Sequence, residues 1–221
     1  MAYDWQTSPP PAQALARLAE GNRRFREGQV GPAVRSWSKD MAERPQRPFA
    51  VVFGCSDSRT PVEILFDQGF GDLFVVRIAG NVVAPSIIGS IEFATAQFGT
   101  RLVVVMGHTK CGAIDATVHA LETGFGPESR NIRSITDRIG PHIEHIIAPL
   151  STSRVDHESI LRDAMRANVR AAGDQLRHGS RIIEELVISG RLAVVSAEYE
   201  IETGTVHFFD EIESPPSDRG P

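Results

Sequence analysis

The chain contains very little cysteine, with two residues in 221. So few cysteines in a chain of this length exclude the disulfide framework of a small secreted protein. No apolar run approaches the roughly 18 residues that a membrane-spanning helix needs. The first residues also lack the basic and apolar regions of a signal peptide. We therefore expect a cytoplasmic protein with reduced thiols and no membrane contact.

The sequence also lacks an excess of basic residues. Lysine and arginine number 23 against 28 aspartate and glutamate residues, which gives a net charge of −5. Nucleic-acid-binding proteins carry clustered positive charge, so this balance argues against a nucleic-acid partner. No G-x-G-x-x-G motif follows a predicted strand, which argues against a dinucleotide-binding module.

Apolar runs alternate with helical patterns along most of the chain. The runs predict strands over residues 49–54, 72–80 and 101–107, a fourth strand from residue 192, and an outer strand near 205–209. The helical patterns cover residues 61–69, 84–99, 111–124 and 131–189, the last with breaks near Pro149 and Gly179. Strands that are apolar throughout are typical of parallel sheets covered on both faces. We therefore predict an α/β fold with a mostly parallel central sheet of about four strands plus an edge strand, flanked by helices.

Both cysteines stand in the same local context. Cys55 follows the first apolar run in "FAVVFGCSDSR", and Cys111 follows the third run in "VVVMGHTKCGAIDA", three residues after His108. In sheets of this kind, ligands bind outside the carboxyl ends of the strands. Two thiolates and one imidazole suit Zn²⁺, and three protein ligands leave one position open, as in catalytic sites. The pattern predicts one zinc ion per chain.

Two other interpretations of the cysteines stay open. Cysteine is among the most buried residue types, so each one alone is typical of a core position. Cys55 and Cys111 could also form a redox disulfide, although neither belongs to a C-x-x-C pair. The three residues together, at the ends of two strands, favour the metal site.

Asp57 and Arg59 directly follow Cys55 and can pair across a turn. A carboxylate near the metal could accept a proton from zinc-bound water, or occupy the open position as a fourth ligand. The guanidinium could hold it there with two hydrogen bonds. An incidental surface salt bridge is the alternative.

The motif "CSDSR" followed by "GHTKCGA" resembles the β-class carbonic anhydrases, over residues 46–124 and more weakly over 192–209. The resemblance implies that zinc is held by Cys55, His108 and Cys111 and that Asp57 and Arg59 form a catalytic dyad. It further implies a substrate pocket. The residues of that pocket would be Gln46, Phe74 and the backbone N–H near Gly112.

The resemblance also implies a homodimer, or two such dimers assembled into a tetramer (a dimer of dimers), with the substrate pocket at the subunit interface. A helix predicted over residues 12–27 would reach over the partner subunit. On this basis we expect an N-terminal helical arm used in dimerisation (1–48), a single α/β zinc-binding catalytic domain (49–210) and a flexible tail (211–221).

The implied activity is the reversible hydration of CO₂ to bicarbonate and a proton by zinc-bound hydroxide. Such an enzyme is a carbonate dehydratase, a zinc lyase. Two alternatives stay open: hydrolysis of carbonyl sulfide or carbon disulfide on the same scaffold, and a zinc or carboxylate sensor without activity. A sensor is expected to have lost Gln46, Asp57 or Arg59, and all three are present.

Overall fold

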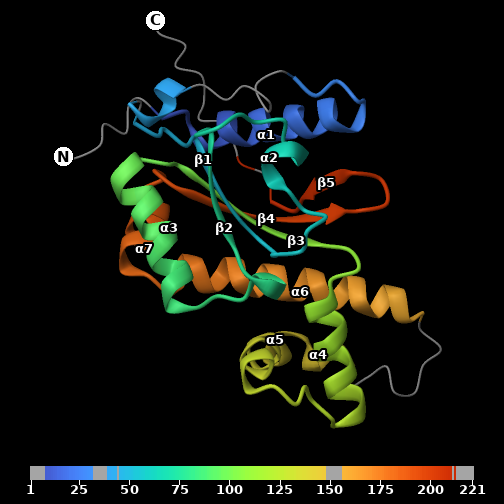
Figure 1. Cartoon of the computed structure of the whole chain (residues 1–221). Helices are drawn as coiled ribbons and strands as arrows, with labels where there is room; N and C mark the ends of the chain where they lie inside the picture. The colour runs from blue at the N-terminus through green and yellow to red at the C-terminus, as the bar shows by residue number, and fades with distance from the viewer. Residues whose placement is uncertain (1–7, 32–38, 44, 148–155, 211, 213–221) are drawn as a thin grey trace, which may run out of the picture.

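The computed structural model describes residues 8–31, 39–43, 45–147, 156–210 and 212. A central sheet lies between two layers of helices (Figure 1). Helices α4 (Gly112–Thr123) and α5 (Arg130–Ile147) lie beyond the carboxyl ends of the strands. None of the helices in these ranges is long and apolar enough to cross a bilayer.

The sheet has five strands in the order β2-β1-β3-β4-β5. They are β1 (Ala50–Gly54), β2 (Leu73–Arg77), β3 (Leu102–His108), β4 (Ala193–Glu200) and β5 (Thr205–Phe208). The first four strands run parallel to one another, and β5 pairs with β4 in the antiparallel direction. The predicted α/β class and mostly parallel sheet are confirmed. Because β1 pairs directly with β3 in the parallel direction, the carboxyl ends of these two strands lie side by side.

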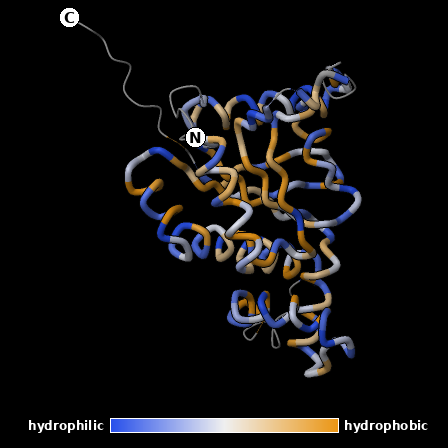
Figure 2. The backbone as a smooth tube through the Cα atoms, turned by 60° about the vertical axis from the view of Figure 1, so that its left-hand side comes forward, coloured by the Kyte–Doolittle hydropathy of each residue, from blue (hydrophilic) through white to orange (hydrophobic). Residues whose placement is uncertain are grey.

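The side chains of each strand alternate between two cores, one on each face of the sheet. Val51 and Phe53 of β1 face one layer of helices, while Ala50 and Val52 face the other. Figure 2 shows the strands as the hydrophobic centre of the chain. The first face is covered by α3 (Pro85–Phe98), α6 (His157–His178) and α7 (Arg181–Ile188), and apolar side chains of α4 and α5 extend the same core beyond the ends of the strands. This double coverage explains why the strands are apolar without interruption.

The second face is covered by α1 (Pro11–Arg26) and by α2 (Val62–Leu65). Leu18 of α1 is fully buried, and Asn22 donates hydrogen bonds to the carbonyl groups of Leu65 and Gly204. Helix α1 therefore packs against its own subunit. Its predicted reach over a partner subunit is a separate contact and stays a prediction.

Several element boundaries differ from the sequence prediction. The helix expected over 61–69 is the single turn α2, which gives way to Asp67 at a φ of 48°. Strand β2 ends at Arg77 rather than near residue 80, because a short 3₁₀ turn, η4 (Ala79–Asn81), follows it with Gly80 at a φ of 65°. Another 3₁₀ turn, η3 (Lys39–Ala42), lies before β1. The expected break near Pro149 and, apart from Ile212, the expected tail lie outside the described residues.

Candidate active site

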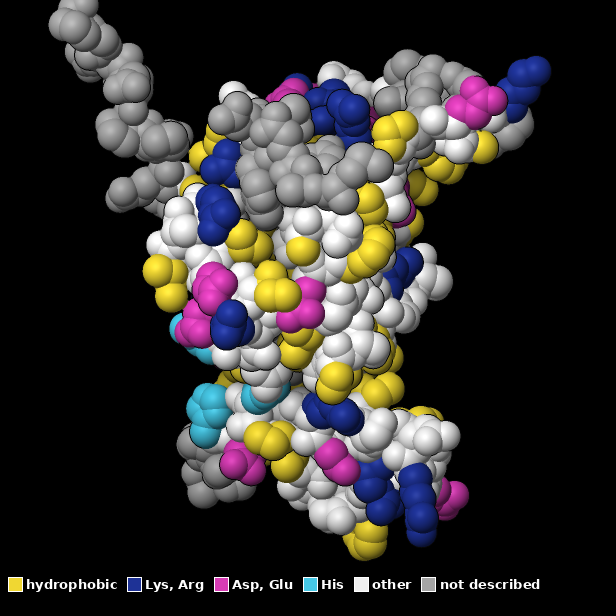
Figure 3. Space-filling model, turned by 90° about the vertical axis from the view of Figure 1, so that its left-hand side faces the viewer, with side chains coloured by type: hydrophobic (Ala, Val, Ile, Leu, Met, Phe, Trp, Pro, Cys, Tyr) yellow, Lys and Arg dark blue, Asp and Glu magenta, His cyan; other side chains and the backbone are white. Residues whose placement is uncertain are grey.

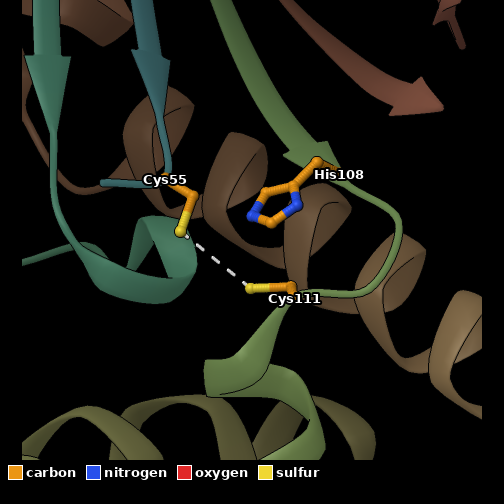
Figure 4. A group of neighbouring side chains, drawn as sticks. All are labelled: Cys55, His108 and Cys111. Atoms are coloured by element: carbon orange, nitrogen blue, oxygen red, sulfur yellow. Dashed lines mark hydrogen bonds between the residues drawn. The ribbon is translucent and has the colours of Figure 1, made fainter. Parts of the chain in front are cut away.

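Three side chains meet where β1 and β3 end (Figure 4). Cys55 directly follows β1, His108 is the last residue of β3, and Cys111 directly precedes α4. The sulfur and nitrogen atoms that these residues offer all lie within 4.8 Å of one another, and all three residues are buried. The predicted convergence of these residues is confirmed.

The spacing of these atoms fits a zinc ion. The two sulfurs are 4.0 Å apart, close to the roughly 3.8 Å that two Zn–S bonds of about 2.3 Å span in a tetrahedral site. His108 Nδ1–H donates to the carbonyl oxygen of Thr109 at 2.9 Å, so the lone pair lies on Nε2. Among the described residues, Nε2 is buried without a hydrogen-bond partner. A buried acceptor without a donor is costly, and a metal ion would satisfy it.

The two cysteines are free thiols rather than a disulfide. Their hydrogen bond lowers the pKa of Cys55 and raises the pKa of Cys111, because the two sulfurs share one proton. Burial opposes ionisation of both groups. The N–H of Gly80, which donates to Cys55 Sγ at 3.3 Å, also lowers the pKa of Cys55. A divalent cation at this point would displace the shared proton and hold both sulfurs as thiolates.

Asp57 and Arg59 form the two-bond pair that the sequence suggests. Arg59 Nε donates to Oδ1 at 2.9 Å, and Arg59 Nη2 donates to Oδ2 at 2.7 Å. These bonds hold the pKa of Asp57 well below its usual range, so the carboxylate is ionised at neutral pH. Oδ2 lies 4.0 Å from His108 Nε2, which places the carboxylate beside the three ligand atoms. The pair therefore lies beside the cluster, and its predicted role as a catalytic dyad stays a prediction.

Arg77, at the end of β2, holds the loop that carries Cys55 and Asp57. Its Nε donates to the carbonyl oxygen of Cys55 at 2.8 Å, and its Nη2 donates to the carbonyl of Asp57 and to Thr60 Oγ1. Arg77 is absent from the predicted catalytic set. The feature that could have identified Arg77 is its register in the sheet. It pairs with Gly54, and Gly54 directly precedes the first cysteine.

Gly112 is the first residue of α4 and is exposed beside the cluster. The backbone N–H groups of the next two residues, Ile114 and Ala113, lower the pKa of Cys111, although the opposing effects of Cys55 and burial are larger. The partial positive charge of a helix N-terminus favours a thiolate at this point. The predicted role of the Gly112 N–H toward a bound substrate is not part of this geometry and stays a prediction.

Gln46 and Phe74 do not lie beside the cluster within one chain. Gln46 precedes β1 and Cys55 follows it, so the two residues lie beyond opposite ends of a strand that alone spans about 16 Å. Gln46 is exposed, in a depression that Met41 and Phe70 also line. Phe74 pairs with Val51, four residues before Cys55, and its ring lies 6.1 Å from that of Phe98. Their predicted part in the substrate pocket is therefore not formed by these contacts within one chain and stays a prediction.

Comparison with known proteins identifies the family. The family model described as carbonic anhydrase matches residues 50–206. A carbonic anhydrase from Mycolicibacterium smegmatis is 41% identical over 197 residues, covering 89% of this chain and 92% of the relative. The solved structure of the β-carbonic anhydrase CcaA aligns with this chain at a TM-score of 0.65 and 25% identity. The alignment covers 89% of this chain and 95% of the CcaA chain. The chain belongs to the β-carbonic anhydrase family.

Further relatives agree with the β-carbonic anhydrase assignment. Carbonic anhydrase 2 of Mycobacterium tuberculosis is 36% identical over 205 residues, with 91% of this chain and 94% of the relative covered. The fold is shared with the β-carbonic anhydrase CafA of Aspergillus fumigatus, which covers 91% of each chain with a TM-score of 0.69 at 23% identity. The matched range of the β-carbonic anhydrase family model includes the three ligand candidates and the Asp57–Arg59 pair.

Proposed function

We propose that this protein catalyses the reversible hydration of CO₂ to bicarbonate and a proton, with one zinc ion per chain held by Cys55, His108 and Cys111. The observation that carries the proposal is the buried cluster itself. Its two sulfurs are spaced for one metal ion, and among the described side chains its imidazole nitrogen has no other partner. Zinc ligation requires both thiols to be reduced, which favours the cytoplasm as the location.

A zinc ion bound there would supply a Lewis acid that lowers the pKa of water to near neutrality. Asp57 is the group placed to take a proton from that water. Its carboxylate is ionised, lies beside the ligand atoms and has one side chain, Arg59, that fixes both oxygens. Because Arg59 occupies both oxygens, it also disfavours direct ligation of Asp57 to the metal. We therefore assign Asp57 as the proton acceptor and Arg59 as the residue that orients it.

The chain also supplies groups that hold the Asp57 loop in place beside the cluster. Arg59 Nη2 donates to the carbonyl oxygen of Lys110 at 3.1 Å, which connects the Asp57 loop to the loop that carries Cys111. Arg77 fixes the same Asp57 loop from β2. We propose that the N–H of Gly112, at the start of α4, faces the oxygen that becomes part of bicarbonate. A backbone donor so placed stabilises the negative charge that develops on that oxygen.

The position of Gln46 supports an oligomer in which two chains share each pocket. Gln46 lies beyond the amino end of β1, so its side chain can contribute only to the cluster of a second copy of the chain. We therefore propose that Gln46 orients CO₂ or bicarbonate in the site of its partner. Exposed apolar side chains support burial by a second copy, since Phe70 beside Gln46 and Phe93 on α3 are 62% and 52% exposed. Hydrophobic side chains also reach the surface on the face that carries α3 (Figure 3). We propose a homodimer, with residues 1–48 as its arm and Phe74 in the shared pocket.

The proposed position of Gln46 in its partner's site predicts complementation between an impaired chain and an inactive one. Gln46→Ala alone should lose at least about tenfold in CO₂ hydration, because a positioned donor to the substrate is removed. Cys55→Ser alone should be inactive. Heterodimers of the two, isolated through two different affinity tags, contain one site with both Cys55 and the partner's Gln46 intact. Their rate per dimer should therefore recover to about half that of the wild type, with one working site of two.

The matched control for this experiment is a heterodimer of wild-type and doubly substituted chains. In that heterodimer both changes lie on one chain, so a pocket shared between chains leaves neither site complete. A pocket built within one chain leaves one site complete instead. Activity in the control and none in the complementing pair would therefore contradict the shared pocket.

The experiment that tests the proposed function compares two substrates on one zinc-quantified preparation. Stopped-flow measurement should show rapid CO₂ hydration, while release of sulfide from carbonyl sulfide or carbon disulfide should be slower by orders of magnitude. Sulfide release without CO₂ hydration would instead assign the site to hydrolysis of the sulfur compounds. Absence of both activities in zinc-loaded protein would assign it to a sensor.

A further inference from the structure

A chain of hydrogen bonds runs from helices α5 and α6 to one of the three proposed zinc ligands. It ends at Gly80, whose N–H donates to Cys55 Sγ at 3.3 Å. An N–H bond to a thiolate withdraws charge from the sulfur, and so sets how strongly that sulfur donates to a metal. The strength of this bond depends on how firmly the Gly80 peptide is held.

Side-chain packing cannot hold this backbone, because the position requires glycine. Gly80 has a φ of 65°, in the left-handed region that disfavours other residues. A Cβ at this point would also lie 2.8 Å from Ile139 Cδ1 and 3.0 Å from Ala113 Cβ. A glycine in a short turn is free to rotate about φ and ψ unless hydrogen bonds fix its peptides.

Asn168 supplies that fixation. It lies on α6, is 1% exposed, and its Nδ2 donates to the carbonyl oxygen of Gly80 at 2.9 Å. The N–H of the same peptide, which belongs to Asn81, donates to the carbonyl of Ile78 at 3.0 Å. Both ends of this peptide are therefore held, which fixes ψ of Gly80. With ψ fixed, the N–H on the other side of Gly80 stays directed at Cys55.

The amide of Asn168 is itself held in one orientation. His142 Nδ1 lies 3.2 Å from Asn168 Oδ1, and His142 Nε2 lies 3.1 Å from Gln175 Nε2. The amide nitrogen of Gln175 donates to Nε2, so His142 donates from Nδ1 to Oδ1. The Nδ2 group of Asn168 then faces Gly80.

We propose that Asn168 is a positioning residue that sets the donor strength of Cys55 toward the metal by holding the N–H of Gly80 against its sulfur. The inference rests on the proposed zinc site, and it assigns a role to a residue on a helix that contributes no ligand. Outer partners of metal ligands typically change metal affinity by about 10-fold to 100-fold. We expect an effect at the lower end of this range, because the Gly80 N–H survives the substitution and loses only its orientation.

The test uses the cobalt(II)-substituted protein, whose sulfur-to-cobalt charge-transfer band reports directly on the thiolates. Asn168→Leu removes the donor while keeping the branched shape and the number of heavy atoms, and Asn168→Asp replaces the donor with an acceptor. In both variants the band should move to lower energy, because the sulfur lone pair rises when the N–H bond weakens. Zinc affinity, measured by chelator competition, should fall by about tenfold, because Cys55 is no longer held in the position that ligation needs, and this loss outweighs the stronger donation of the released sulfur.

Asn22 offers a matched control. It is an equally buried asparagine that donates to two backbone carbonyls, on α1 and remote from the cluster. Asn22→Asp should lower the melting temperature without moving the cobalt band or the zinc affinity. Should the Asn168 variants fail to fold, His142→Phe at a half-buried position releases the same amide, and a smaller shift of the same sign is expected.

The outcomes separate the inference from the function on which it rests. A wild-type protein without a sulfur-to-cobalt band would contradict the proposed ligand set. A normal wild-type band that is unchanged in folded Asn168→Leu or His142→Phe would overturn the role of Asn168 alone. Equal shifts in Asn22→Asp would show a general loss of stability and would also overturn it.

Discussion

Replacing His108 with alanine is expected to remove most of the bound zinc and to slow CO₂ hydration by at least about a thousandfold. Nε2 of this residue faces the two sulfurs, and the nearest carboxylate oxygen to it is 4.0 Å away in an ion pair with Arg59. Loss of the imidazole leaves two thiolates, which do not complete a tetrahedral site. Without the metal, water keeps a pKa far above neutrality rather than one of about 7, so no nucleophile forms at neutral pH.

His119→Ala provides the control for this substitution, since His119 is an exposed histidine on α4. That variant should keep full zinc content and rate. Cys55→Ser and Cys111→Ser should behave like His108→Ala, because a serine hydroxyl does not ionise to replace a thiolate. Elemental analysis and stopped-flow rates on the same samples decide the outcome. Full zinc and full activity in any of the three ligand variants would remove that residue from the ligand set.

Asp57→Asn is expected to keep zinc but to lose about 10²-fold to 10⁴-fold in turnover, the range for removal of a general base. The amide has nearly the same shape, yet it neither accepts the proton nor pairs with the Arg59 guanidinium. Arg59→Ala should also keep zinc and should lose activity, because Asp57 is then free to approach the metal. Arg59→Lys should recover little of this loss, since a single ammonium cannot make the two bonds to Oδ1 and Oδ2.

The pH dependence of the Arg59→Ala defect follows from the depressed pKa of Asp57. Because the pKa of Asp57 is lower in the folded protein than in the unfolded chain, where it is about 3.9, the ionised carboxylate adds to the free energy of unfolding above that pH. This contribution is lost as the pH falls through the folded-state pKa. Without Arg59, the Asp57 pKa returns toward the ordinary value, and the carboxylate is still ionised at neutral pH. The ratio of variant to wild-type rates should thus stay constant between about pH 6 and 9.

Arg23→Ala is the control for a lost ion pair, since Arg23 pairs with Glu20 on the exposed face of α1. It should leave rate and zinc content unchanged, as expected for a surface pair. A constant, reduced ratio for Arg59→Ala beside a normal Arg23→Ala supports the orienting role. Near-normal rates in both Asp57→Asn and Arg59→Ala would contradict the dyad, and a defect confined to acidic pH would show that Arg59 acts only by keeping Asp57 ionised.

The fold and the metal ligands are predictable from the sequence because both depend on local patterns. Uninterrupted apolar runs such as Val51–Phe53 indicate strands buried on both faces, and the structure pairs them as a parallel sheet. Neighbouring parallel strands have their carboxyl ends side by side, so Cys55 and His108 lie close together because β1 and β3 are neighbours. The Asp57–Arg59 pair is equally local, two residues apart within one turn.

The remaining features depend on contacts between distant segments. Asn168 reaches Gly80 across 88 residues, and this contact depends on how α6 packs against η4. Arg77 holds the Cys55 loop because the register of β2 places it beside Gly54. The proposed place of Gln46 in the pocket depends on how two subunits are arranged, which no periodicity within one chain encodes. Such positions are set by packing rather than by local sequence preference.

The most direct measurement is the rate of CO₂ hydration as zinc is returned to metal-free protein, with both cysteines kept reduced. The rate is expected to rise in proportion to added zinc and to stop rising at one zinc ion per chain. His108→Ala protein treated in the same way should stay inactive at that ratio. Full activity in the metal-free protein, or a rate that rises equally in His108→Ala, would contradict a zinc-dependent carbonic anhydrase built on Cys55, His108 and Cys111.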